Sequence, residues 1–163
     1  MKLRSLEEKI IPREKISELC NKLRASGKRI ISTNGCFDLI HLGHISYLLE
    51  ARNLGDILIV GINCDSSVKK LKGDSRPLQS ESTRAKQMAG LESVDFVTIF
   101  TEDTPETLLG LIKPEIHVKG GDYLPENLPE KKIVESSGGK VVCVSMIKGY
   151  STTQMIEKMK SNL

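Results

Sequence analysis

Apolar residues follow two alternating patterns along this chain of 163 residues. Short continuous apolar runs rich in branched residues are typical of strands covered on both faces, and apolar residues three or four positions apart indicate amphipathic helices. The strand pattern occurs at residues 29–33, 57–62, 95–100, 115–119 and 141–145. The helix pattern occurs at residues 12–26, at 45–54, over about ten residues after Ser80, from residue 104 to about 110, at 126–137 and from 151 onward. Residues 66–79 are predicted to form a polar loop after a short helical turn.

The alternation of strands and helices predicts an α/β fold. We expect a single Rossmann-like domain over residues 1–163, with a five-stranded, mostly parallel sheet, helices on both faces and a helical extension at residues 1–27. The last helix is expected to turn Ile156 and Met159 inward. Ligands of such sheets bind beyond the carboxyl ends of the strands, so the loops that follow the strands should border one cleft.

The composition excludes several classes of partner. A net charge of +3 and an aromatic content of 4% leave few groups for stacking on bases, so no nucleic acid is expected. The four cysteines include no CxxC pair, which is typical of reduced thiols. No apolar run reaches the roughly 18 residues of a membrane helix, and no apolar stretch follows the charged N-terminus. We therefore expect a cytoplasmic protein without a membrane partner.

Residues 33–44, TNGCFDLIHLGH, join the first predicted strand to a helix. A helix N-terminus carries unpaired N–H groups and partial positive charge, and it therefore attracts anionic oxygen. His41 and His44 are three positions apart, which places both rings on one side of the first helical turn. Gly35 and Gly43 lack the Cβ atom that would obstruct a phosphate against the backbone. The segment is a candidate phosphate site, and ordinary capping or packing of loop histidines is the alternative.

A zinc site is a sharper alternative for the two histidines. Zinc takes three or four ligands from histidine, cysteine or carboxylate side chains. The third histidine, His117, lies inside a predicted strand, and the sequence contains neither an HExxH motif nor paired cysteines. We therefore expect no protein-bound metal.

Basic residues follow the second predicted strand and close the fourth. They are Lys69, Lys72, Arg76 and Arg84 after the second strand, and Lys119 at the end of the fourth. A ligand with several phosphate groups needs several cations near it, but lysine-rich turns are also common as solvated surface. Gly120 permits a close approach to a ligand, Asp122 can accept hydrogen bonds from hydroxyl groups, and Ser151, Thr152 and Thr153 can cap the last helix.

The HxGH pattern preceded by Gly-x-Phe-Asp resembles the nucleotidyltransferase superfamily, whose members join a phosphorylated acceptor to a nucleotide and release pyrophosphate. Further segments fall in the order and spacing of one branch, the D-glycero-β-D-manno-heptose 1-phosphate adenylyltransferases, in a stand-alone form. These segments are Lys72-Gly73, Arg76-Pro77, Arg84, residues 102–105, residues 118–123 and residues 151–153. The resemblance covers nearly the whole chain.

The resemblance, together with the residue types, implies three sets of site residues. The catalytic set is His41, His44 and Lys119. The nucleotide-binding set is Thr33, Asn34, Gly35, Phe37, Gly43, Gly120, Asp122, Ser151, Thr152 and Thr153. The set that binds the acceptor or its phosphate is Asp38, Asp65, Lys69, Lys72, Arg76 and Arg84.

The implied reaction transfers AMP from ATP, with Mg²⁺ carried by the nucleotide, to D-glycero-β-D-manno-heptose 1-phosphate, and it yields ADP-heptose and pyrophosphate. The chain lacks a P-loop motif, so a separate upstream kinase is expected to make the acceptor. The alternatives are a cytidylyltransferase for an alcohol phosphate, an adenylyltransferase for a flavin or pantetheine phosphate, and a non-catalytic regulatory module. Related glycerol phosphate cytidylyltransferases carry an arginine where this chain has Met146, which favours ATP. A homo-oligomer remains open.

Overall fold

A computed structural model describes residues 3–121, 128–147 and 149–161, and its five strands form one sheet in the order β3-β2-β1-β4-β5. The strands are β1 (Ile30–Gly35), β2 (Ile57–Asn63), β3 (Phe96–Phe100), β4 (Ile116–Gly120) and β5 (Lys140–Val144). Every pairing of neighbouring strands is parallel. The predicted α/β, Rossmann-like fold with a five-stranded sheet is therefore confirmed.

The direction in which strands are added reverses between β1 and β4. From β1 the chain adds β2 and β3 on one side, and then crosses to add β4 and β5 on the other. β1 and β4 pair at Ile31↔Ile116 and Ser32↔His117, in the first half of each strand. A reversal of this kind leaves a crevice at the carboxyl ends of the two central strands, which is where open α/β sheets bind ligands.

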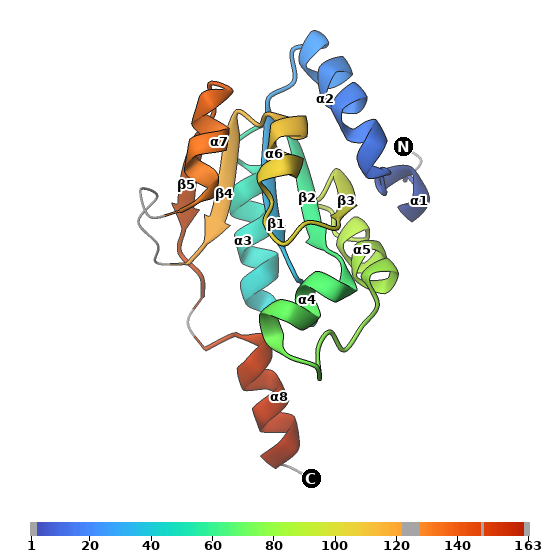
Figure 1. Ribbon diagram of the computed structural model, residues 1–163, viewed down its shortest axis with the longest axis vertical. Coiled ribbons are helices and arrows are strands. Elements are labelled where there is room, and N and C mark those ends of the chain that lie inside the picture. The colour runs from blue at the N-terminus through green and yellow to red at the C-terminus, as the bar shows by residue number, and fades with distance from the viewer. Residues whose placement is uncertain (1–2, 122–127, 148, 162–163) are drawn as a thin grey trace.

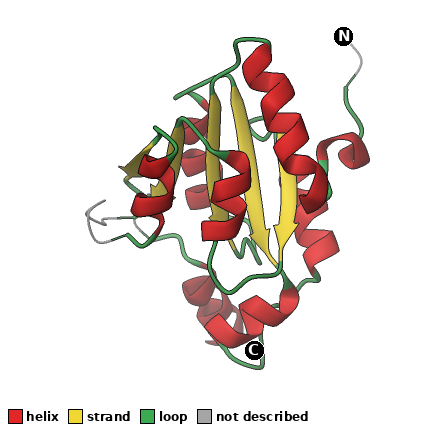
Figure 2. Ribbon diagram, turned by 45° about the horizontal axis from the view of Figure 1, so that its top comes forward, coloured by secondary structure: helices red, strands yellow, loops and turns green. Residues whose placement is uncertain are grey.

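Helices cover both faces of the sheet (Figures 1 and 2). They are α1 (Leu6–Lys9), α2 (Ile16–Ala25), α3 (Leu42–Arg52), α4 (Asp65–Lys72), α5 (Glu81–Ala89), α6 (Glu106–Ile112), α7 (Glu130–Ser136) and α8 (Thr152–Ser161), with a 3-10 turn at Arg13–Lys15. None of the described helices is long and apolar enough to cross a membrane.

Alternate residues of the central strands point into separate cores. Ile31 and Val60 pack with α3 and α5 on one face, whereas Ile30 and Ile59 pack with α2 and α6 on the other. A smaller cluster joins α6, α7 and β5. This period of two follows from the pleat of a strand, and it explains why the strands are apolar on both sides. Because Ile16 of α2 is fully buried in the second core, the predicted N-terminal extension is part of the fold.

Three expectations from the sequence need correction. The segment after β2 is an eight-residue helix, α4, rather than a loop after a short turn. Its Ser67 and Val68 are buried, so the helix is held by packing despite its lysines. In α8 none of the described residues is buried and Met159 is 57% exposed, so the inward orientation predicted for it is wrong. The described part of the predicted helix at 126–137 begins only at Glu130.

The turn between α7 and β5 depends on a glycine for steric reasons. A Cβ atom on Gly139 would lie 2.2 Å from the carbonyl oxygen of Pro114, whereas a Cβ on Gly110, inside α6, would meet nothing closer than 3.8 Å. Of these two glycines, Gly139 is therefore required by its surroundings and Gly110 is not.

We expect Gly139→Ala to lower the free energy of unfolding by about 1–3 kcal/mol, the scale of an overpacked core. Gly110→Ala is the matched control and should raise it by about 0.5–1 kcal/mol, because alanine loses less entropy in a helix. Urea titrations of both variants measure the difference. Equal stability of the two would contradict the steric argument.

Candidate active site

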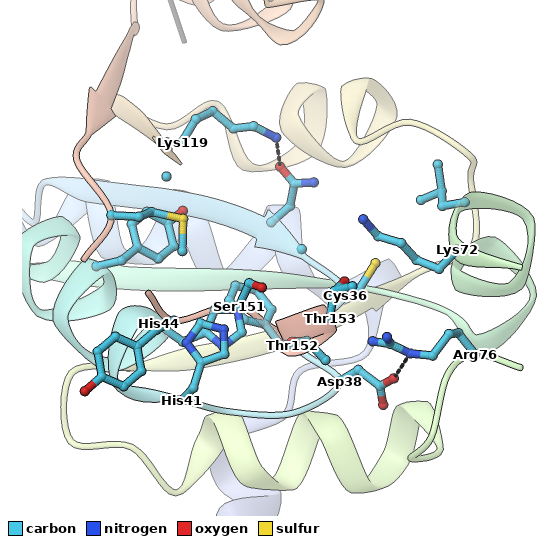
Figure 3. Close-up of a pocket in the computed structure, with 18 of the residues that line it drawn as sticks. Cys36, Asp38, His41, His44, Lys72, Arg76, Lys119, Ser151, Thr152 and Thr153 are labelled. Atoms are coloured by element: carbon cyan, nitrogen blue, oxygen red, sulfur yellow. Dashed lines mark hydrogen bonds and ion pairs between the residues drawn. The ribbon is translucent and has the colours of Figure 1, made fainter. Parts of the chain in front are cut away.

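A cavity of about 660 Å³ lies at the carboxyl edge of the sheet, where the loops after β1, β2, β4 and β5 meet. Its size is within the range of small-molecule sites. Predicted residues that line it are Asn34, Gly35, Phe37, Asp38, His41, His44, Lys72, Arg76, Lys119, Gly120, Ser151, Thr152 and Thr153. The single cleft expected from the sequence is thus present, and Figure 3 shows the labelled side chains around it.

Some predicted site residues lie elsewhere. Thr33, Gly43, Asp65, Lys69 and Arg84 do not line the cavity, and Asp122 lies outside the described residues. The Thr33 hydroxyl is buried against Tyr47, and the exposed Lys69 pairs with Asp74. Thr33 therefore packs inside the protein, and Lys69 lies on its surface.

His41 and His44 form a stacked pair at the start of α3. His41 is the N-cap residue with extended backbone, and His44 lies in the first helical turn. Their ring centroids are 3.8 Å apart with an interplanar angle of 20°, and Phe37 contacts His44 edge-on at 5.2 Å. The two imidazoles therefore share one volume, as their spacing predicts.

Burial keeps both histidines neutral near pH 7. Burial lowers the pKa of His44 to about 4, and it also lowers the pKa of His41. The Nδ1 atoms of both rings are buried and have no hydrogen-bond partner among the described residues. The pair thus offers unused hydrogen-bonding atoms rather than two fixed positive charges.

The glycines of this loop make room for its own rings. A Cβ on Gly43 would lie 3.0 Å from His41 Nδ1, and a Cβ on Gly35 would lie 3.0 Å from the Phe37 ring. Glycine at these positions lets the aromatic and imidazole rings fold back over the backbone. The nearest atoms to these two positions are thus side chains of the same loop, and the close approach of a phosphate stays a prediction.

Asp38 joins the loop after β1 to the segment that follows α4. Its buried carboxylate accepts hydrogen bonds from Arg76 Nε at 2.6 Å, from Leu78 N at 2.8 Å and from Gln79 N at 3.0 Å. Burial raises the pKa of Asp38, but these hydrogen bonds outweigh that effect and hold the pKa below its usual range. With so many partners, Asp38 orients Arg76 at the cavity edge.

Arg84 is the main correction to the predicted site, because its side chain is fully buried instead of facing a substrate. Its guanidinium donates to the carbonyl oxygens of Gln79 at 3.0 Å, Cys36 at 2.6 Å and Asn63 at 2.8 Å, and to Asp65 Oδ1 at 2.8 Å. A guanidinium has five N–H donors in a planar fork, which suits it to bind several carbonyls at once. Arg84 thus fastens the loop after β1 to the end of β2.

Lys119 lies on the other side of the cavity from the histidines (Figure 3). Its Nζ donates to Glu130 Oε1 at 2.8 Å and to Asn34 Oδ1 at 3.4 Å. Glu130 lines the same cavity, although nothing in the sequence singled it out among the many acidic residues. The ion pair spans β4 and α7 and holds the lysine at the end of the crevice between β1 and β4.

Tyr47 and the start of α8 complete the lining. The Tyr47 hydroxyl donates to the carbonyl oxygen of Val118 at 3.0 Å and contacts Thr33, so a side chain of α3 joins β1 to β4. Ser151 Oγ accepts from Gln154 N at 3.1 Å, which is the capping role predicted for it. Met146, at the place where an arginine would indicate a cytidylyltransferase, also lines the cavity.

Protein ligands for a metal are sparse in this region. Within residues 3–121, 128–147 and 149–161 there is no group of three or more histidine, cysteine or carboxylate side chains that could hold an ion. The third histidine, His117, is buried inside the sheet, where its Nδ1 bonds Ser32 Oγ at 2.8 Å. Asp38 and Glu130, the carboxylates that line the cavity, are each paired with a cation.

Comparison with known proteins places these features in a family. Residues 32–161 match the family described as cytidylyltransferase-like. The chain is 50% identical over 156 residues to the bifunctional protein HldE of Trichlorobacter lovleyi, covering 96% of this chain and 32% of that protein. It is 47% identical over 162 residues to the bifunctional protein HldE of Bradyrhizobium sp., covering 98% and 33%. The chain thus spans about a third of the length of these curated relatives.

A solved structure is also similar. The crystal structure of the lipopolysaccharide core biosynthesis protein from Thermoplasma volcanium superposes with a TM-score of 0.62 at 29% sequence identity. The match covers 77% of this chain and 100% of that one. The similarity therefore extends across most of the fold.

Replacement of Arg84 tests its structural role. Arg84→Ala should lower the free energy of unfolding by about 3–5 kcal/mol, because it leaves the buried carbonyl of Asn63, two partly buried carbonyls and the partly exposed Asp65 carboxylate without their shared partner. Lys86→Ala, at an exposed position of the same helix, should change it by no more than about 0.5 kcal/mol. Thermal and urea unfolding measure both. A melting curve of Arg84→Ala that matches that of the unchanged protein would show that this network is dispensable.

Proposed function

We propose a specific reaction for this chain, which belongs to the cytidylyltransferase-like family and is a nucleotidyltransferase. In this reaction AMP passes from ATP to D-glycero-β-D-manno-heptose 1-phosphate, giving ADP-heptose and pyrophosphate. The observation that carries the proposal is the convergence of the stacked His41 and His44, Lys119 and Ser151 on one cavity at the carboxyl edge of a parallel sheet. The similarity to bifunctional HldE proteins and to a lipopolysaccharide core biosynthesis protein supports a sugar phosphate as the acceptor.

The histidines stabilise the charge that develops during transfer. The acceptor phosphate oxygen attacks the α-phosphorus in line, the bond to the β-phosphate oxygen breaks, and pyrophosphate leaves. Donors fixed in advance around the transferring phosphorus lower the barrier without reorganising at the moment of reaction. The neutral imidazoles at the start of α3 supply such donors, and their stacking fixes both rings. No covalent intermediate with the protein is required.

Magnesium enters this proposal as part of the substrate, MgATP. The metal neutralises the triphosphate and so reduces its repulsion toward the second anion. The described residues offer no cluster of ligands for a resident ion, and the carboxylates of the cavity are used by Arg76 and Lys119. The residues present are therefore suited to binding the phosphate oxygens directly, with the metal bound to the nucleotide.

A phosphorylated acceptor has to be made by a phosphoryl-transfer step that precedes this one. The relatives carry the name bifunctional, and this chain aligns with about a third of each. We propose that a separate kinase activity supplies the sugar 1-phosphate to the cavity described above. Holding two anions in reactive positions is then the main contribution of the binding site.

Cytidylyl transfer to an alcohol phosphate is the second candidate, because the matching family is described as cytidylyltransferase-like. Met146 argues for ATP instead, since it places a thioether in the cavity lining where related glycerol phosphate cytidylyltransferases carry an arginine. A regulatory module that binds nucleotide without turnover is the third candidate, and it requires only the fold.

Replacement of a histidine tests the catalytic assignment. His44→Ala should lower kcat by about 100- to 1000-fold, the effect of losing one preorganised donor, with a much smaller effect on the affinity for ATP. His41→Ala should behave in the same way. Glu50→Ala, at an exposed position of α3, is the matched control and should turn over normally. Near-normal kcat in a folded histidine variant removes that histidine from the mechanism.

A substrate matrix tests the reaction itself. The purified protein is offered ATP, CTP, GTP or UTP with heptose 1-phosphate, glycerol 3-phosphate, pantetheine phosphate or flavin mononucleotide, and pyrophosphate release is measured. We expect ATP with heptose 1-phosphate to dominate and chelation of Mg²⁺ to abolish the signal. A dominant CTP signal would support the second candidate. Nucleotide binding without turnover in any combination would support the third.

A further inference from the structure

Lys119 and Glu130 form an ion pair in which each side chain keeps one unused hydrogen-bonding group. These groups are the third N–H donor of Lys119 and the Oε2 acceptor of Glu130. An ammonium group carries three donors. Two donors of Lys119 are directed at Glu130 Oε1, 2.8 Å away, and Asn34 Oδ1, 3.4 Å away. The third remains for a ligand, because Lys119 lines the cavity and its side chain is still 20% exposed.

The second oxygen of Glu130 is unpaired within the part of the chain that the structure describes. Glu130 is 4% exposed, and its Oε2 is buried without a hydrogen bond from any described residue. Burial raises the pKa of Glu130, but the hydrogen bond and the positive charge of Lys119, together with smaller contributions from the backbone and from His117, outweigh that effect and hold the pKa below its usual value. An ionised carboxylate can only accept, and an unsatisfied buried acceptor is costly. Because Glu130 lines the cavity, a ligand bound beside its carboxylate can supply the donor that Oε2 lacks.

The chemistry of the pair restricts that ligand. A phosphate oxygen beside Glu130 Oε2 would meet a like charge, so an anionic group is excluded there and a hydrogen-bond donor is favoured. Lys119 Nζ, which is bonded to the other oxygen of the same carboxylate, favours an anionic oxygen. A phosphate with a hydroxyl group close to it in the same molecule fits both atoms together.

We propose that Glu130 binds a sugar hydroxyl through Oε2 while Lys119 binds the phosphate of the same sugar phosphate. This rests on the proposed function, since both substrates of that reaction are phosphorylated sugars. The hydroxyl belongs either to the ribose of the nucleotide or to the ring of the acceptor, and both have the required chemistry. Glu130 is thus a specificity residue as well as the partner that orients Lys119.

The position of Glu130 in the cavity is consistent with this role. His41 and His44 begin α3 on one face of the sheet, whereas Glu130 belongs to α7 on the other. Lys72 and Arg76 come from a third edge of the cavity, after β2. Imidazole and basic groups therefore surround the part of the cavity away from Glu130, and the carboxylate lies where a sugar ring can be held without repelling the triphosphate.

Paired changes in protein and ligand test the proposal by calorimetric binding, without turnover. The protein variants are Glu130→Ala and, as the control on an exposed position of the same helix, Glu135→Gln. The ligands are ATP, 2′-deoxy-ATP and 3′-deoxy-ATP for the ribose, and heptose 1-phosphate and its 2-deoxy analogue for the acceptor. Circular dichroism checks that each variant is folded. Glu130→Gln, which keeps the buried volume, replaces the alanine variant if that one does not fold.

We expect Glu130→Ala to weaken binding of one hydroxylated ligand by about 10- to 100-fold, the scale of a charge-assisted hydrogen bond. Removal of the contacted hydroxyl should weaken binding to the unchanged protein by a similar factor, and the two losses should not add. If the losses are non-additive for the ATP analogues, the contacted hydroxyl belongs to the ribose. If they are non-additive for the heptose 1-phosphate analogue, it belongs to the acceptor. Glu135→Gln should bind all ligands normally.

Equal weakening of hydroxylated and deoxy ligands would overturn the proposal, because Glu130 would then act only by holding Lys119. Unchanged binding in a folded Glu130 variant, or no binding of any of these ligands to the unchanged protein, would also overturn it. The proposed function and the proposed hydroxyl contact are contradicted by different results. Binding with non-additive losses but without pyrophosphate release contradicts adenylyl transfer alone, and normal release with additive losses contradicts only the hydroxyl contact.

Discussion

Two buried charges of opposite sign hold the loop that carries the histidines. Arg84 binds the carbonyl oxygens of Cys36 and Asn63, and Asp38 binds the backbone N–H groups of Leu78 and Gln79. The cation thus satisfies acceptors and the anion satisfies donors in the same few segments, which would otherwise bury unpaired backbone groups. Breaking either set leaves an uncompensated charge inside the protein. The position of the loop that carries the histidines therefore depends on Arg84 and Asp38.

The fold and the centre of the site were predictable because they follow from local patterns. Runs such as residues 57–62 indicate a doubly covered strand, and the spacing of His41 and His44 fixes their common side on a helix. The role of Arg84 was not predictable, since the sequence shows a cation after a strand but not the two distant carbonyls that bury it. Met159 was misplaced for the same reason: periodicity identifies an amphipathic helix without identifying what it packs against.

The reversal of strand order explains why residues so far apart in sequence converge. Tyr47 and Thr33 join across the α3 face of the sheet, while Asn34 and Lys119 meet on the face of α7. Adjacent residues of β1, Thr33 and Asn34, therefore point to opposite faces, as the pleat requires. The crevice at the ends of β1 and β4 is thus reached from both layers of helices, which is how imidazoles from one layer and a carboxylate from the other come to line one cavity.

Compensation of charge within the cavity has a consequence for binding. Arg76 is paired with Asp38, Lys119 is paired with Glu130, and burial keeps His44 neutral. Among the described lining residues, two of the cations are therefore paired with carboxylates, and the site carries less positive charge than its residue types suggest. A phosphate group arriving there gains hydrogen bonds from donors that are already oriented by their carboxylate partners. In the proposed reaction, orientation rather than net charge is then the contribution of these residues, because a rigidly held donor keeps its full effect when charge develops in the transition state.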